Sequence, residues 1–207
     1  MDIATVSSPE RGAAHRALAA FAARLIDQRL RVVGALQIST ATADARHCDM
    51  DLSVLPDGPV IRINQNLGPG SRGCRLDVGA LETAVAATEA ALAGGADLLI
   101  VNKFGKLEAE GRGFRALIAE ALCRNVPVLV VVNGLNRDAF EAFVDGGSID
   151  LPADPHALDR WFAALRRAQR VSAAQDLPPA SAKRFGGSRG KAKPGTAGAV
   201  PGHFRVV

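Results

Sequence analysis

The fold of this chain is constrained most strongly by the run Leu98-Leu99-Ile100-Val101-Asn102-Lys103-Phe104-Gly105-Lys106-Leu107-Glu108, with Gly111-Arg112-Gly113-Phe114 shortly after it. Residues 97–101, which begin one residue before this run, are predicted to form a strand, and from Leu98 on they have the continuous apolar pattern of a strand that is buried on both faces of a parallel sheet. The run turns polar at Asn102, so a loop follows the carboxyl end of that strand. Because open α/β sheets bind ligands at the carboxyl ends of their strands, this loop is a predicted ligand site.

Strand and helix patterns alternate on both sides of this run. In chain order they are a strand at 3–6, a helix at 12–29, a strand at 31–38, a hairpin of 49–55 and 60–64 turned by Pro56-Asp57-Gly58, a helix capped by Asp77 and ended by Gly94-Gly95, a helix at 112–124, a strand at 127–132, and helices at 137–144 and 155–170. Repeated β-α units predict an α/β fold, with a mostly parallel sheet flanked by helices and a small β-hairpin insertion.

Length and composition fit one globular domain. With 207 residues, of which 48% are apolar, the chain can bury a core, and no apolar run approaches the roughly 20 residues of a membrane span. The N-terminus lacks a signal-peptide pattern, and the three cysteines form no CxxC pair. We therefore expect a cytoplasmic protein with reduced thiols and no membrane contact.

The positive charge is concentrated near the C-terminus. The formal net charge is +4, and residues 172–207 hold six Lys or Arg and one Asp, a surplus of five that leaves −1 for residues 1–171. This segment is also rich in Ala, Gly, Pro and Ser without usable periodicity, so we expect an α/β domain at 1–171 and a basic disordered tail at 172–207. Such a tail either stays solvated or weakly contacts an acidic or nucleic-acid partner.

The loop after the first strand has the length of a phosphate-binding loop. Residues 7–14 read Ser-Ser-Pro-Glu-Arg-Gly-Ala-Ala against the pattern GxxxxGK[ST], so the second glycine is present as Gly12. The lysine that would neutralise phosphates is replaced by Ala13, and the hydroxyl that would hold magnesium by Ala14. Arg11 or His15 can supply positive charge from positions that are unusual for this pattern. The alternative to a phosphate-binding loop is an ordinary strand-to-helix turn.

From Ile100 to Phe114 the chain resembles a small bacterial and archaeal nucleoside-triphosphatase family. The second motif of that family is an apolar strand followed by Asp-Glu-Ile-Gly-Lys-Met-Glu and, six residues later, Phe; here Gly105, Lys106, Glu108 and Phe114 match. The order of elements also agrees over roughly residues 2–145. The resemblance implies a P-loop-like fold.

A closer resemblance is to an uncharacterised bacterial family of unknown function that is related to those nucleoside triphosphatases. It is carried by residues 101–106 together with Cys48-Asp49-Met50-Asp51 and Gly68-Pro69-Gly70. Members of that family are often labelled by analogy as nucleoside triphosphatases or as molybdenum-transport ATP-binding proteins. Since one fold carries many functions, the function still has to be argued from the site.

The chain departs from the hydrolytic pattern where the charge matters most. Asn102 stands where the hydrolytic family has the Asp that holds hydrated magnesium, and Lys103 stands where it has a water-activating Glu. The local formal charge thereby changes from −2 to +1, which repels a divalent cation and attracts an anion. Lys103 and Lys106 then either supply positive charge to the ligand site or are solvated loop lysines. Glu108 either belongs to the ligand site or pairs with one of the two lysines.

Three further residues belong to the predicted ligand site. Arg72 and Arg75 lie in a glycine-rich segment whose amides and guanidinium groups suit an oxyanion, with a plain surface loop as the alternative. Asn133 ends a buried strand, where it recognises a ligand or caps the next helix. His47, Cys48, Asp49, Asp51 and Cys74 are metal-ligand types without supporting spacing, so we expect no metal site.

These observations predict a binding or regulatory protein for an anionic small molecule, either a nucleotide or an oxyanion such as molybdate, with little or no hydrolysis. The predicted ligand-binding residues are Arg11, Gly12, Arg72, Arg75, Asn102, Lys103, Lys106, Glu108 and Asn133. A nucleotide is a possible cofactor, and magnesium is not expected to be tightly held. The alternatives are a divergent nucleoside triphosphatase and a scaffold that acts through its basic tail.

Overall fold

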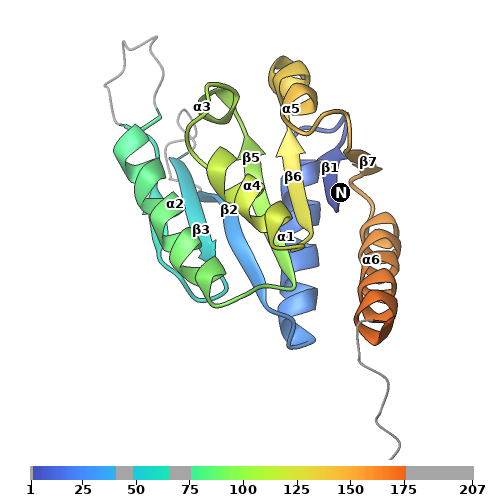
Figure 1. Ribbon diagram of the computed structural model, residues 1–207. Coiled ribbons are helices and arrows are strands. Elements are labelled where there is room, and N and C mark those ends of the chain that lie inside the picture. The colour runs from blue at the N-terminus through green and yellow to red at the C-terminus, as the bar shows by residue number, and fades with distance from the viewer. Residues whose placement is uncertain (1, 41–48, 66–75, 176–207) are drawn as a thin grey trace, which may run out of the picture.

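The computed structural model describes residues 2–40, 49–65 and 76–175, which contain a seven-stranded sheet (Figure 1). The strands are β1 (Ile3–Ser7), β2 (Val32–Thr40), β3 (Asp49–Leu55), β4 (Val60–Arg62), β5 (Leu98–Phe104), β6 (Val128–Val132) and β7 (Ile149–Pro152). Their order across the sheet is β4-β3-β2-β5-β6-β1-β7. The five strands from β2 to β7 in this order are parallel, and β3 and β4 are antiparallel to their neighbours. The predicted mostly parallel sheet is confirmed.

Helices cover both faces of the sheet (Figure 1). They are α1 (Ala13–Asp27), α2 (Val78–Ala93), α3 (Lys106–Ala109), α4 (Arg115–Cys123), the 3₁₀ turn η1 (Gly134–Asn136), α5 (Arg137–Phe143) and α6 (Pro155–Gln175). One apolar cluster joins the sheet to α2, α4 and α5, and a second joins it to α1 and α6. The result is a three-layer α/β arrangement with two cores.

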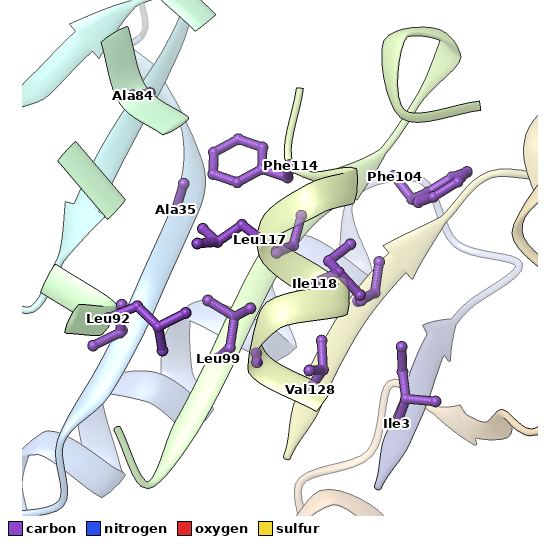
Figure 2. Close-up of a cluster of buried hydrophobic side chains, with 14 of the residues drawn as sticks. Ile3, Ala35, Ala84, Leu92, Leu99, Phe104, Phe114, Leu117, Ile118 and Val128 are labelled. Carbon is purple, nitrogen blue, oxygen red and sulfur yellow. The ribbon is translucent and has the colours of Figure 1, made fainter. Parts of the chain in front are cut away.

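Strand β5 is apolar throughout because its two sides belong to different cores. Leu99 and Val101 pack in the cluster with α2 and α4, whereas Leu98 and Ile100 pack in the cluster with α1 and α6. Figure 2 shows Leu117 and Ile118 of α4 above the first of these faces. The apolar run that suggested a buried parallel strand thus reflects burial on both faces.

A single glycine allows β2 to approach β5 closely. Gly34 has φ of 147°, and a Cβ there would lie 1.9 Å from the carbonyl oxygen of Ile100. No other residue type fits without moving one of the two central strands. This contact sets how closely β5, the strand that leads into the site, packs against β2.

Most sequence predictions of elements are confirmed, and the differences are local. Asp77 caps α2 by accepting a hydrogen bond from the amide of Ala80 at 3.0 Å, as expected. The hairpin exists, and its strand β3 pairs along β2, so that it extends the edge of the main sheet. The helix predicted from Arg112 begins at Arg115, because the one-turn helix α3 precedes it, and the short strand β7 was not predicted.

The C-terminal helix continues past the predicted domain boundary. α6 runs to Gln175, four residues beyond 171. Residues 176–207 lie outside the described part of the chain, so the tail and its partner stay predictions. None of the helices within the described residues combines the length and the apolar character that crossing a membrane would require.

Candidate functional site

The loop between β1 and α1 has the layout of a phosphate-binding loop without its side chains. β1 ends at Ser7, and Gly12 precedes α1 in the left-handed conformation, with φ of 79°. No side chain caps this helix, and its first turn holds no acidic residue, so the helix dipole leaves the end attractive to anions. Ala13 begins the helix and Ala14 is buried, so methyl groups occupy both positions that lysine and hydroxyl would need.

The side chain of His15, in the first turn of α1, meets that of Asn102 near the end of β5. The imidazole Nδ1 is hydrogen-bonded to Oδ1 of Asn102. Partial burial, opposed by this hydrogen bond and assisted by the charge of Lys103, holds the pKa of His15 below its usual value of 6.5. The imidazole is therefore neutral at pH 7 and donates from Nδ1.

Asn102 is buried and incompletely satisfied. It is 3% exposed, and its Nδ2 is one of two buried side-chain nitrogen or oxygen atoms that lack a hydrogen-bond partner among the described residues. Leaving a buried amide donor unpaired costs on the order of 1–3 kcal/mol. A ligand that offers an acceptor here would recover part of that free energy.

The lysines after β5 are exposed and differ in their partners. Lys106 lies 3.7 Å from Glu110, which also pairs with Arg112 at 3.0 Å, so part of its charge is compensated. Lys103 is exposed and forms no ion pair with any described residue. Lys103 is thus the more available cation at this edge.

Glu108 has a structural role that the sequence did not reveal. Its Oε2 accepts a hydrogen bond from the amide of Gly105 at 2.8 Å, and its Oε1 accepts one from the amide of Phe114 at 3.1 Å. The alternative that Glu108 pairs with Lys103 or Lys106 is wrong, because both carboxylate oxygens hold the backbone of the β5–α4 connection instead. The single turn α3 exists because this side chain caps it.

Asn133 caps the segment that follows β6. Its Oδ1 accepts hydrogen bonds from the backbone amide of Asn136 at 3.1 Å and from Nδ2 of the same residue at 2.8 Å. The capping alternative is therefore confirmed for the 3₁₀ turn η1. Asn133 also borders the pocket described next, so capping and ligand contact are compatible.

A pocket of about 420 Å³ opens at this edge of the sheet. Five of the nine predicted ligand residues line it, namely Asn102, Lys103, Lys106, Glu108 and Asn133. The remaining lining residues are mostly apolar: Gln37, Met50, Leu52, Ile63, Leu76, Leu81, Gly105, Leu107, Phe114, Leu135 and Asn136. Sequence reasoning missed the apolar wall because its members come from separate elements that only the fold brings together.

The other predicted site residues are placed as follows. Arg11 is exposed in the β1–α1 loop and, like Gly12, lies outside the pocket lining. The His15–Asn102 hydrogen bond links the first turn of α1, which follows that loop, to the pocket. Arg72 and Arg75 fall outside the described residues, as do His47, Cys48 and Cys74. Within the described ranges no three His, Cys, Asp or Glu side chains form a group that could hold a metal ion.

A polar network beside the loop was also missed. Asp150 of β7 accepts hydrogen bonds from Thr5 at 2.6 Å and Ser7 at 3.1 Å, and Arg137 lies 3.3 Å from the same carboxylate. Burial, the largest influence, raises the pKa of Asp150, but the bonds from Thr5, Arg137 and Ser7 together hold it below its usual value. This network ties β7 and α5 to β1, directly before the loop.

Comparisons with known proteins agree with the fold. A family model described as "Protein of unknown function (DUF2478)" matches residues 3–161. A relative, the "Molybdenum import ATP-binding protein ModC 2" of Bradyrhizobium diazoefficiens, is 33% identical over 145 residues, which is 70% of this chain and 16% of that protein. The chain thus spans about one sixth of the length of this relative.

A solved structure has the same overall fold. It is the solution structure of a human cancer-related nucleoside triphosphatase, with a TM-score of 0.51 and 15% sequence identity. The match covers 84% of this chain and 98% of that one. At this identity the likeness shows the fold alone, which confirms the predicted P-loop-like α/β architecture.

Proposed function

Since the chain belongs to the family described as "Protein of unknown function (DUF2478)" and has a nucleoside-triphosphatase fold, we propose that it binds an anionic ligand, a nucleotide in the first place, and hydrolyses it weakly or not at all. The ligand lies at the carboxyl edge of β1, β5 and β6. Magnesium contributes little to its binding.

The hydrogen bond between His15 and Asn102 is the observation that carries this proposal. It joins the first turn of α1, directly after the β1–α1 loop, to β5 near its carboxyl end. Proteins of this fold hold phosphates and their metal between these two segments. Here that junction consists of a neutral imidazole and a neutral amide, and Ala14 offers no hydroxyl. A hydrated divalent cation has no anionic ligand at this junction, whereas an anion meets donors.

The surrounding charges favour an anion and disfavour hydrolysis. Lys103 and Arg11 are exposed cations that form no ion pair within the described residues, and the N-terminus of α1 adds the positive end of its dipole. Glu108, which lines the same pocket as Lys103, accepts hydrogen bonds from two backbone amides and is poorly placed to activate water. Binding without efficient turnover is the chemistry that these groups support.

A small oxyanion is the second candidate ligand. The 33% identity with a protein named as a molybdenum import ATP-binding protein favours molybdate as a probe. Because this chain spans only 16% of that protein, we treat transport and its partners as outside the proposal. Molybdate and nucleotides share the requirement for hydrogen-bond donors and positive charge.

The test is a thermal-shift and calorimetric panel of ATP, GTP, phosphate, sulfate and molybdate, each with and without magnesium. A ligand at 100 times its dissociation constant raises the free energy of unfolding by about 2.7 kcal/mol. We expect at least one anion to stabilise the protein independently of magnesium, and Lys103→Ala to weaken its binding about 3- to 10-fold, the effect of losing one charge-assisted contact at an exposed site.

Arg167→Ala is the matched control, because it removes one exposed positive charge from α6, near the opposite edge of the sheet. It should leave the affinity unchanged. If no anion shifts the stability of the wild-type protein, the proposal fails. Magnesium-dependent phosphate release that Lys103→Ala abolishes would replace it with the divergent nucleoside triphosphatase.

A further inference from the structure

The pocket beside Asn102 is larger than an inorganic anion requires. Its volume of about 420 Å³ compares with roughly 30 Å³ for a water molecule in the liquid, so a phosphate or molybdate ion would leave most of it to solvent. Pockets for small organic ligands usually measure about 300–1,000 Å³. The cavity therefore has room for an organic body in addition to a charged group.

The wall of the pocket is apolar and built from the core. Leu52, Leu81, Leu107 and Phe114 line it while being at most 7% exposed, and they come from β3, α2, α3 and the turn before α4. Side chains fixed by packing on four elements give a wall of defined shape. Water in contact with such a wall is displaced favourably by an apolar or aromatic ring.

The polar residues that line the pocket come from β2 and β5 and from the segments that follow β5 and β6. Lys103 brings positive charge, Asn102 brings a buried Nδ2 without a partner among the described residues, and Gln37 and Asn136 bring further amides. Glu108 also lines the pocket, but its carboxylate oxygens accept hydrogen bonds from the amides of Gly105 and Phe114. An anionic group fits here, with its organic part directed toward the apolar wall.

We infer that this pocket binds a ring-bearing organic anion, with the ring against Leu81, Leu107 and Phe114 and the acidic group at Lys103. The inference rests on the proposed anion binding and names the chemical class of its ligand. A nucleoside phosphate and an aromatic carboxylic acid share this chemistry. An inorganic oxyanion, which is the second candidate ligand of the proposed function, has no ring and does not share this chemistry.

Leu135 makes the inference testable without disturbing the core. It lines the mouth of the pocket from η1 and is 94% exposed, so that its removal should not unfold the protein. A ring in the pocket covers part of this side chain, whereas an inorganic anion at Lys103 does not. Val171, on α6, is a matched exposed apolar residue at 57% exposure, and it lies outside the pocket.

The experiment compares the affinities of the full-length protein for ATP, GTP, benzoate, adenosine and inorganic triphosphate by calorimetry. We expect at least one ring-bearing anion to bind tenfold or more tightly than inorganic triphosphate. Leu135→Ser should reduce this advantage about threefold while leaving the affinity for triphosphate unchanged, and Val171→Ser should change neither. A comparison of the affinities for ATP and GTP with the affinity for benzoate distinguishes a nucleoside phosphate from an aromatic carboxylic acid as the ligand.

Methyl NMR locates the ring independently of affinity. Ring currents from a bound aromatic ligand should shift the methyl signals of Leu81, Leu107 and Met50, which line the pocket, more than those of Ala13 and Ala14 at the start of α1. Larger shifts at the two alanines would place the ring elsewhere and overturn the inference.

The outcomes separate this inference from the proposed function. If inorganic triphosphate binds as tightly as every ring-bearing anion, or if Leu135→Ser weakens both equally, the inference is wrong and anion binding stands. If adenosine alone binds and no anion does, the proposed function is wrong, and this inference falls with it because the acidic group then has no role at Lys103.

Discussion

His15 and Asn102 are joined by a hydrogen bond across the edge of the sheet, from the first turn of α1 to β5. The imidazole donates from Nδ1 to the amide oxygen, and the amide nitrogen is left buried without a partner within the described residues. In the proposed function, this neutral pair stands where hydrolysis would need a cation-binding centre.

The neutral state of His15 predicts how stability depends on pH. Because burial lowers its pKa in the folded protein, the unfolded chain takes up a proton first as the pH falls below 6.5. The free energy of unfolding should therefore fall from its plateau above pH 6.5 as the pH decreases toward the folded-state pKa. Denaturant unfolding between about pH 5 and pH 8 measures this slope.

His15→Gln should remove that slope, since glutamine does not titrate. His156→Gln is the control, because His156 is exposed at the start of α6 and its side chain forms no hydrogen bond with a described residue. An unchanged slope in His15→Gln, or its loss in His156→Gln, would show that the burial of His15 is not the cause.

Asn102→Asp should restore an anion at the junction and reverse the shift of His15. A carboxylate in contact with the imidazole favours the protonated form, so the pKa of His15 should rise above 6.5. Because Asn102 is 3% exposed, the added charge should also destabilise the protein at pH 8, by about 1–3 kcal/mol, and less at pH 6, where His15 is protonated.

Magnesium provides the second readout for Asn102→Asp. Combined with Lys103→Glu, the substitution changes the local formal charge from +1 to −2, and magnesium should then stabilise the variant and leave the wild-type protein unaffected. Histidine NMR titration and unfolding with and without magnesium measure both effects. A variant with a pKa still below 6.5 would contradict the assigned contact.

Sequence alone predicts the fold well because burial on both faces leaves a local signature. Each of these signatures spans only a few consecutive residues. The apolar runs of β5 and β6 and the Asp77 cap of α2 are of this kind, and all three are confirmed. The strand β7 was missed because Ile149 and Asp150 are exposed, so the segment has no burial pattern to detect. Its stability comes from pairing with β1, which is distant in sequence.

The site is less visible in the sequence for a related reason. Asn102 and Lys103 can be singled out by comparison with the hydrolytic pattern, and they do line one pocket. The wall of that pocket depends on Leu52 and Leu81, which carry no signal beyond ordinary core positions. Glu108 was expected near a lysine because a motif gives residue types, whereas its amide partners depend on backbone geometry that the motif does not encode.

The hydrogen bonds of Glu108 predict an unequal effect of two nearby glycine substitutions. Gly113 has φ of 57°, and a Cβ there would lie 2.2 Å from Oε1 of Glu108, whereas Gly111 has φ of 88° with open space around it. Gly111→Ala should destabilise by about 1–2 kcal/mol, the strain of a left-handed alanine. Gly113→Ala should add the displacement of a carboxylate that holds two buried amides, roughly a further 1–3 kcal/mol.

Glu108→Ala is the companion variant, and it should abolish the difference. Without the carboxylate, Gly113→Ala has no clash to relieve, so the two glycine substitutions should destabilise the Glu108→Ala protein to a similar extent. Denaturant unfolding of the single and double variants gives the coupling free energy between the two positions. A coupling near zero would mean that Glu108 does not hold the connection as described.

Asp150 should stabilise the protein at neutral pH and lose that effect in acid. Burial acts to raise its pKa, but the hydrogen bonds from Thr5, Arg137 and Ser7 and the charge of Arg137 leave it below 3.8, the usual value. The unfolded chain is therefore protonated first as the pH falls, so the stabilisation is complete above pH 3.8 and is lost as the pH falls through the folded-state pKa.

Asp150→Asn should flatten the dependence of unfolding free energy on pH between about pH 2 and pH 5. Asp145→Asn is the control, because Asp145 is exposed and has φ of 52°, which asparagine tolerates, and it should leave that dependence unchanged. Because this carboxylate fixes the end of β1, Asp150→Asn should also weaken anion binding at the β1–α1 loop; an affinity equal to that of Asp145→Asn would limit the network to a role in stability.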